Sequence, residues 1–160
     1  MTLLIVNRQR SRKINVPFFR QIVLAALEEL EIEQAELGIQ LVGVMAMARM
    51  NWQYLQHEGC TDVITFDHGA AGGPEPTSAA MHGELFICVD AALIQAREFG
   101  ATWESEVVRY AVHGILHLLG HDDLKPELRR KMKREENRVV RLLERRFTLA
   151  QLSRAGKIKA

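Results

Sequence analysis

Two histidines one helical turn apart, His113 and His117, are the residues of this chain best suited to chemistry. Side chains four residues apart lie on one face of a helix, so both imidazoles can bind the same cation. Gly120 follows closely and can adopt a left-handed backbone conformation, which lets the chain fold back and supply a third ligand. Three protein ligands leave one position open to water, as in catalytic zinc sites. The segment therefore predicts a catalytic metal centre.

The third ligand is predicted to be Asp123, with His121 as the alternative. Asp123 stands three residues after Gly120, which is the spacing of metzincin-like sites, and a carboxylate is an acceptable zinc ligand. His121 offers a softer nitrogen donor, but it follows Gly120 directly and has little chain in which to double back. The spacing favours Asp123, and the two residues remain alternatives.

Peptide hydrolysis is disfavoured at this centre because Gly114 stands where the related protease motif carries a glutamate. In proteases that carboxylate takes the proton of the attacking water. A site without it can still polarise a phosphoryl oxygen or lower the pKa of a bound water molecule. The residues thus leave a degenerate metalloprotease as a hypothesis that Gly114 argues against.

The motif His113-Gly-x-Leu-His117-Leu-x-Gly120-x-Asp122 resembles the signature of the YbeY family of metal-dependent rRNA-maturation endoribonucleases. The resemblance covers nearly the whole chain in order, through Asn51-Trp-x-Tyr54, Thr61-Asp-Val-Ile-Thr-Phe66, Gly83-Glu-Leu-Phe-Ile87 and Gln95-Ala-x-Glu-Phe-Gly100. It implies an α+β fold, a zinc-like ion, cleavage of single-stranded RNA, and roles in 16S rRNA 3′-end maturation and ribosome quality control. It also implies binding to the small ribosomal subunit, with contacts to a small-subunit ribosomal protein and a ribosome-assembly GTPase.

The chain departs from the family pattern at three positions. The family's usual third ligand is a histidine where this chain has Asp123, which makes the site harder and more anionic and can change its metal preference. Leu55 occupies the place of an arginine that could clamp phosphate. Arg49, about a turn earlier, is a candidate to replace that arginine. Cys60 stands in place of a proline, which we interpret as a small packing change.

Three further polar residues have both a functional and a structural interpretation. Asp122 is a candidate to orient a ligand imidazole, or it can accept a backbone hydrogen bond after the helix. His68 and His82 flank a long loop and could approach RNA or metal, although exposed loop histidines commonly do neither.

Four further side chains could either contact the substrate or pack within the fold. Arg109 and Tyr110 precede His113 by about one turn and could face the cleft or support helix packing. Trp52 and Tyr54 could stack on bases, but aromatic side chains at helical spacing are more commonly buried.

Apolar periodicity identifies the elements that must position these residues. Short apolar runs predict strands at 3–6, 37–44, 62–66 and 84–89, and helical spacing predicts helices at 16–30, 45–54, 91–99, 103–119 and 127–147. The helix that starts at Trp103 is apolar nearly all round, so we expect it to be central and buried. The alternation predicts an α+β fold with helices on a small mixed, mostly parallel four-stranded sheet. The loop at 67–82 is long enough to be functional or disordered.

The composition describes a single soluble domain. The chain has 160 residues, of which 48% are hydrophobic and 26% charged, and we place the domain at 1–149 and a flexible basic tail at 150–160. No apolar run approaches a membrane span, the N-terminus reads as a strand, and two distant cysteines suit a reduced, cytoplasmic protein.

The net charge of +1 hides a strong asymmetry. Residues 125–160 carry 13 Lys and Arg against 4 Asp and Glu, whereas the rest of the chain has a balance of −8. A polyanionic partner would explain this pattern, and so would a solvated helix face with internal ion pairs. The sequence thus supports a metal-dependent endoribonuclease or, alternatively, a ribosome-associated metal-binding factor whose catalysis is weak or lost.

Overall fold

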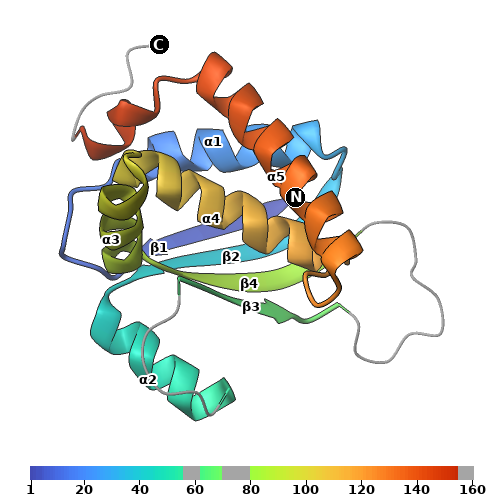
Figure 1. Ribbon diagram of the computed structural model, residues 1–160, viewed down its shortest axis with the longest axis horizontal. Helices are drawn as coiled ribbons and strands as arrows, with labels where there is room; N and C mark the ends of the chain where they lie inside the picture. The colour runs from blue at the N-terminus through green and yellow to red at the C-terminus, as the bar shows by residue number, and fades with distance from the viewer. Residues whose placement is uncertain (56–61, 70–79, 155–160) are drawn as a thin grey trace.

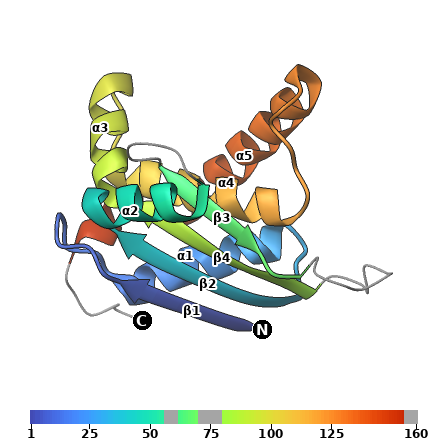
Figure 2. The ribbon, with the colours of Figure 1, turned by 90° about the horizontal axis from the view of Figure 1, so that it is seen from below.

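The computed structural model describes residues 1–55, 62–69 and 80–154, and these form the α+β fold that the sequence predicts. The four strands of one sheet lie in the order β1 (Thr2–Asn7), β2 (Gln34–Val42), β4 (Ala80–Cys88) and β3 (Val63–Asp67). The neighbours β1, β2 and β4 run parallel, and β3 pairs with β4 in the antiparallel sense. The sheet is therefore mixed and mostly parallel, as expected (Figure 2).

The helices cover the two faces of the sheet unequally. They are α1 (Val16–Glu29), α2 (Val44–Leu55), α3 (Val89–Phe99), α4 (Trp103–Leu118), α5 (Pro126–Arg146) and the 3-10 helix η1 (Leu149–Ser153). Figure 1 shows α1, α3, α4 and α5 on one side of the sheet and α2 on the other. One face thus carries the main core, and the other is covered only in part.

Strand alternation explains why one face is buried. In β2 the apolar residues Leu37, Ile39 and Leu41 all point to the helical layer and are at most 2% exposed. The register places Ile39 beside Ile5 of β1 and Leu85 of β4, which continues the apolar row across the parallel strands. Period-two alternation is what a half-covered sheet requires.

The central helix α4 packs closely on β4 through two reciprocal glycine–leucine contacts. A Cβ atom on Gly114 would lie 2.7 Å from Leu85 Cδ2, and a Cβ atom on Gly83 would lie 2.5 Å from Leu118 Cδ2. Each element therefore supplies a glycine where the other supplies a leucine. Thr102 begins the helix by accepting a hydrogen bond from the backbone N–H of Ser105 (3.2 Å). The expectation of a buried central helix is confirmed.

Several predicted boundaries were wrong. The strand expected at 37–44 begins at Gln34 and ends at Val42, since Val44 already starts α2; β4 begins at Ala80 rather than at 84. The predicted loop at 67–82 is shortened accordingly, and its residues 70–79 lie outside the described part of the chain.

The flexible tail predicted from residue 150 was also placed too early. Leu152 is fully buried in η1, and its carbonyl accepts a hydrogen bond from the backbone N–H of Asn15 (2.8 Å). An apolar pair, Leu149 and Leu152, anchors this turn to the core, although the basic residues around it predict a solvated tail. Residues 155–160 lie outside the described ranges. No helix in the described ranges is long and apolar enough to cross a membrane.

Candidate metal centre

Three donor atoms converge beside the C-terminal half of α4. The Nε2 atoms of His113 and His117 lie 3.1 Å apart, and Asp123 Oδ2 lies 3.6 Å from His117 Nε2. The ligand atoms of these three residues are all within 4.8 Å of one another. They form the one such group of three or more His, Cys, Asp or Glu residues in the described ranges, so His121 is not part of it.

The other nitrogen of each imidazole is fixed by an acceptor. Glu136 Oε1 lies 2.7 Å from His113 Nδ1, and the backbone carbonyl oxygen of His121 lies 3.1 Å from His117 Nδ1. A carbonyl and an ionised carboxylate can only accept, so both Nδ1 atoms carry the proton. Both Nε2 lone pairs therefore face the space shared with Asp123, as in histidine ligands held by a second hydrogen bond.

The spacing of the donors fits a small divalent ion. With zinc–ligand bonds of about 2.0–2.1 Å, two ligands of a tetrahedral ion lie about 3.3 Å apart. The two measured separations, 3.1 Å between the Nε2 atoms and 3.6 Å to the carboxylate, lie on either side of this value. Two lone pairs that face each other at 3.1 Å repel, and a cation between them removes that repulsion. Two imidazoles and one carboxylate can thus bind a divalent transition metal.

The turn after α4 brings Asp123 back to the histidines. Gly120 has φ +99°, and the backbone N–H groups of Gly120 and His121 donate to the carbonyls of His117 and Leu116 (both 3.0 Å). These two bonds form a Schellman motif, which ends a helix and satisfies its last carbonyls. The same turn directs the carbonyl of His121 to the ring of His117. One glycine therefore ends α4, supplies the second acceptor and returns the chain for Asp123.

Asp122 has the structural role that the sequence left open. Its Oδ1 accepts a hydrogen bond from the backbone N–H of Leu124 (2.8 Å), which closes a turn just after the helix. His113 and His117 take their orienting bonds from Glu136 and the His121 carbonyl, so neither depends on Asp122.

Glu136 of α5 is the functional residue that the sequence analysis missed. Its side chain is 3% exposed and accepts hydrogen bonds from His113 (2.7 Å), Arg109 (2.8 Å) and Lys133 (2.8 Å). Burial alone would raise the pKa of Glu136, but these three donors hold it at about 2. The carboxylate is therefore ionised at neutral pH and stabilises the Nδ1–H tautomer of His113.

A signal for Glu136 was present in the sequence. Met132, Glu136, Val139 and Leu143 recur at the spacing of one helical face, and all four are buried in α5. A carboxylate within an apolar stripe needs a partner from another element, because burial of an unpaired charge is costly. The solvated helix face with internal ion pairs, considered above for this charged segment, would have placed Glu136 at the surface instead. Leu128, a further apolar residue of this helix, is 39% exposed and lies outside the stripe.

Arg109 and Tyr110 have structural contacts within the protein. Arg109 Nη1 donates to Glu136 Oε2 and to Asn137 Oδ1, both at 2.8 Å, so it supports the carboxylate that holds His113. Tyr110 is 5% exposed and belongs to the main core.

The candidates on α2 and β3–β4 belong neither to the metal group nor to the lining of the cavity beside it. Arg49 and Leu55 are exposed on α2 and do not line the cavity beside the metal group. His68 and His82 lie with ring centroids 5.3 Å apart and are not part of the metal group. Of the two alternatives left open for Trp52 and Tyr54, the structure excludes burial, since they are 59% and 57% exposed. Cys60 lies outside the described residues.

Gly114 has a packing role that explains why no glutamate stands there. Its Cα faces β4, and even a Cβ atom would lie 2.7 Å from Leu85 Cδ2. A carboxylate at this position would enter the contact between α4 and the sheet instead of reaching the donors. The structure thus agrees with the interpretation of Gly114 as evidence against a metalloprotease.

Comparison with known proteins gives consistent matches. The family model described as "Endoribonuclease YbeY" matches residues 3–144. A Geobacter metallireducens protein named "Endoribonuclease YbeY" is 32% identical over 149 residues, covering 91% of this chain and 97% of that protein. A Chlorobium luteolum protein of the same name is 37% identical over 110 residues, covering 69% of this chain and 75% of its own length.

Two further matches differ in what they cover. A Myxococcus xanthus protein named "Endoribonuclease YbeY" is 38% identical over 120 residues, which are 72% of this chain but 39% of the longer relative. The solution structure of a Thermotoga maritima protein covers 99% of this chain and 100% of its own, with a TM-score of 0.66 and 21% identity. That likeness supports the fold.

Proposed function

The chain belongs to the endoribonuclease YbeY family, and we propose that it is a metal-dependent endoribonuclease that cleaves single-stranded RNA. The observation that carries the proposal is the convergence of His113 Nε2, His117 Nε2 and Asp123 Oδ2 beside a cavity of about 360 Å³. Arg129 and Arg130 also line this cavity and can offset the charge of a phosphodiester.

The donor set also carries our proposal for the ion, which is Zn²⁺. Two neutral imidazoles and one carboxylate are ligands that zinc accepts, with a position left for substrate or water. When bound, such an ion supplies Lewis-acid chemistry to a phosphodiester. Other divalent transition metals share these ligand preferences, and metal analysis decides between them.

The protein's own groups hold the donors ready. Glu136 and the carbonyl of His121 keep a proton on Nδ1 of His113 and His117, respectively, so each Nε2 presents its lone pair. Arg109 fixes the carboxylate of Glu136 from the preceding turn of α4. Such support reduces the reorganisation that substrate binding requires.

We propose 16S rRNA 3′-end maturation and ribosome quality control as the biological setting. The family resemblance supports this role, together with the cytoplasm as location and the small ribosomal subunit as partner. It also supports contacts with a small-subunit ribosomal protein and a ribosome-assembly GTPase.

A second candidate is a ribosome-associated metal-binding factor with weak or lost catalysis. The observation in its favour is Leu55, an exposed apolar residue where the family carries an arginine. Arg49 does not line the cavity and so supplies no phosphate contact there.

Metal analysis combined with RNA cleavage separates the two candidates. The full chain and its His117→Ala variant are tested for bound metal and for cleavage of single-stranded RNA. We expect one ion per chain in the wild type, together with RNA cleavage that is lost in the variant. Bound metal without His117-dependent cleavage would support the binding factor and contradict the endoribonuclease.

A further inference from the structure

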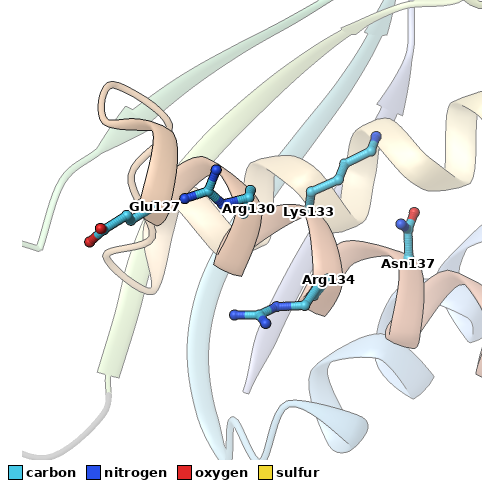
Figure 3. Close-up of a pocket in the computed structure, with 5 residues that line it drawn as sticks. All are labelled: Glu127, Arg130, Lys133, Arg134 and Asn137. Carbon is cyan, nitrogen blue, oxygen red and sulfur yellow. The ribbon is translucent and has the colours of Figure 1, made fainter.

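We propose that a groove along the first half of α5 binds the phosphate backbone of the RNA strand next to the metal centre. The groove has a volume of about 540 Å³ and is lined by Glu127, Arg130, Lys133, Arg134 and Asn137. Figure 3 shows these five side chains on successive turns of α5. The proposal rests on the proposed function, because it assigns a path to the same substrate.

The groove adjoins the cavity of the metal centre. Arg130 and Lys133 line both, and the cavity also includes His113 and Asp123. A chain bound along α5 would therefore enter the space in front of the donor atoms. These shared lining residues distinguish the groove from a basic surface elsewhere on the protein.

Two arginines farther along α5 differ from the arginines of the groove. Arg138 donates to Glu29 (2.8 Å) and to Glu135, and Arg146 lies 3.9 Å from Glu28, so both are tied to acidic side chains. The side chains of Arg130 and Arg134, in contrast, make no hydrogen bond or ion pair with any other described residue.

The other three polar residues of the groove do not add free positive charge. The ammonium group of Lys133 is 2.8 Å from Glu136 Oε2, and Asn137 Oδ1 accepts from Arg109. Glu127 contributes a negative charge at the N-terminal end of the groove. Arg130 and Arg134 therefore provide the positive charge that is free for a ligand.

The chemistry of the groove suits a phosphodiester chain without base recognition. Arg130 and Arg134 are four residues apart, about 6 Å along the helix axis, and lie on one face. A nucleic-acid strand presents an anionic group at every nucleotide and can therefore contact both guanidinium groups at once. The lining residues include no aromatic side chain on which a base could stack. Binding should therefore depend on charge and not on sequence.

The test compares two matched double variants of the full chain. Arg130→Gln/Arg134→Gln removes the free cations of the groove, and Arg141→Gln/Arg145→Gln is the control. The control pair is exposed, has the same spacing on the same helix and lies eleven residues farther on. Eleven residues are about three turns, so the control pair faces nearly the same way but about 16 Å farther from the metal centre.

Binding of labelled oligouridylate and oligoadenylate is measured by fluorescence anisotropy at several salt concentrations, and gels check that each strand is intact. For the groove variant we expect a loss on the order of tenfold for both sequences. The dependence of log K on log salt should weaken by about 1.4, since each contact contributes about 0.7 for a single strand. The Arg130→Lys/Arg134→Lys variant keeps both charges and should bind nearly as the wild type does.

Three results would overturn the proposal: equal losses in the groove and control variants, an unchanged salt dependence, or a loss confined to one sequence. An acidic protein would be the remaining ligand class if RNA binding stayed intact. Cleavage by the wild type and by His117→Ala is measured in parallel. Cleavage that does not depend on His117 contradicts the proposed function, while the binding comparison still decides the role of the groove.

Discussion

Replacing Glu136 by glutamine should weaken metal binding without removing any ligand. The glutamine oxygen can still accept from His113 Nδ1, but the negative charge is lost, and the amide N–H₂ group meets the donors of Arg109 and Lys133. Loss of the group that orients a histidine ligand typically lowers metal affinity about 10- to 100-fold. This corresponds to about 1.4–2.7 kcal/mol.

The assay is a competition titration of Zn²⁺ against a chromophoric chelator, using the full chain at neutral pH. Glu135→Gln is the matched control, because it removes the same charge from the adjacent position of α5. Glu135 bonds to Arg138 on the surface and contacts none of the three ligands. The zinc affinity of the Glu135→Gln variant should remain close to that of the wild type.

The reasoning would be refuted by equal zinc affinities of Glu136→Gln and Glu135→Gln. Glu136 would then serve only the packing of α5 on α4. Circular dichroism shows whether each variant is folded at the temperature of the titration, so a loss of affinity caused by unfolding is recognised. A folded Glu136→Gln with wild-type affinity contradicts the orienting role directly.

Three further predictions follow from the same geometry. Asp123→Ala should lower zinc affinity strongly, whereas His121→Ala should not, because His121 contributes its backbone carbonyl; the same competition titration measures both. Because the pKa of Glu136 is lowered in the folded state, its carboxylate should stabilise the metal-free protein above about pH 4.5, the ordinary pKa of a glutamate. This stabilisation is lost as the pH falls toward 2. Urea unfolding should show this as about 3 kcal/mol that is absent in Glu136→Gln. Gly114→Ala should lower the thermal midpoint, because overpacking against Leu85 costs about 1–3 kcal/mol and exceeds the helix-propensity gain of about 1 kcal/mol.

The predictable part of the centre is local in sequence. His113 and His117 share a helical face by spacing alone, and Gly120 permits the turn that returns Asp123. The choice of Asp123 over His121 also followed from the chain length available after the glycine. These features depend on fewer than a dozen consecutive residues, so backbone geometry determines them.

The missed part depends on packing between distant segments. Glu136 stands 23 residues after His113 and reaches it only because α5 packs across α4. The burial of Leu152 likewise depends on a contact with the start of α1 at Asn15. Periodicity shows that a residue faces inward but not which residue it meets there.

The packing of α4 on the sheet leaves no room for the glutamate that a metalloprotease would need at position 114. Gly114 lies against Leu85, and Gly83 lies against Leu118, so helix and strand approach more closely than side chains at either glycine would allow. This close contact fixes the helix that carries both histidines, and rigid elements hold ligand geometry better than loops do. A glutamate at position 114 would therefore disturb the helix that positions the ligands before it could act as a base. The glycine that removes the protease base is the same residue that allows the metal centre to be rigid.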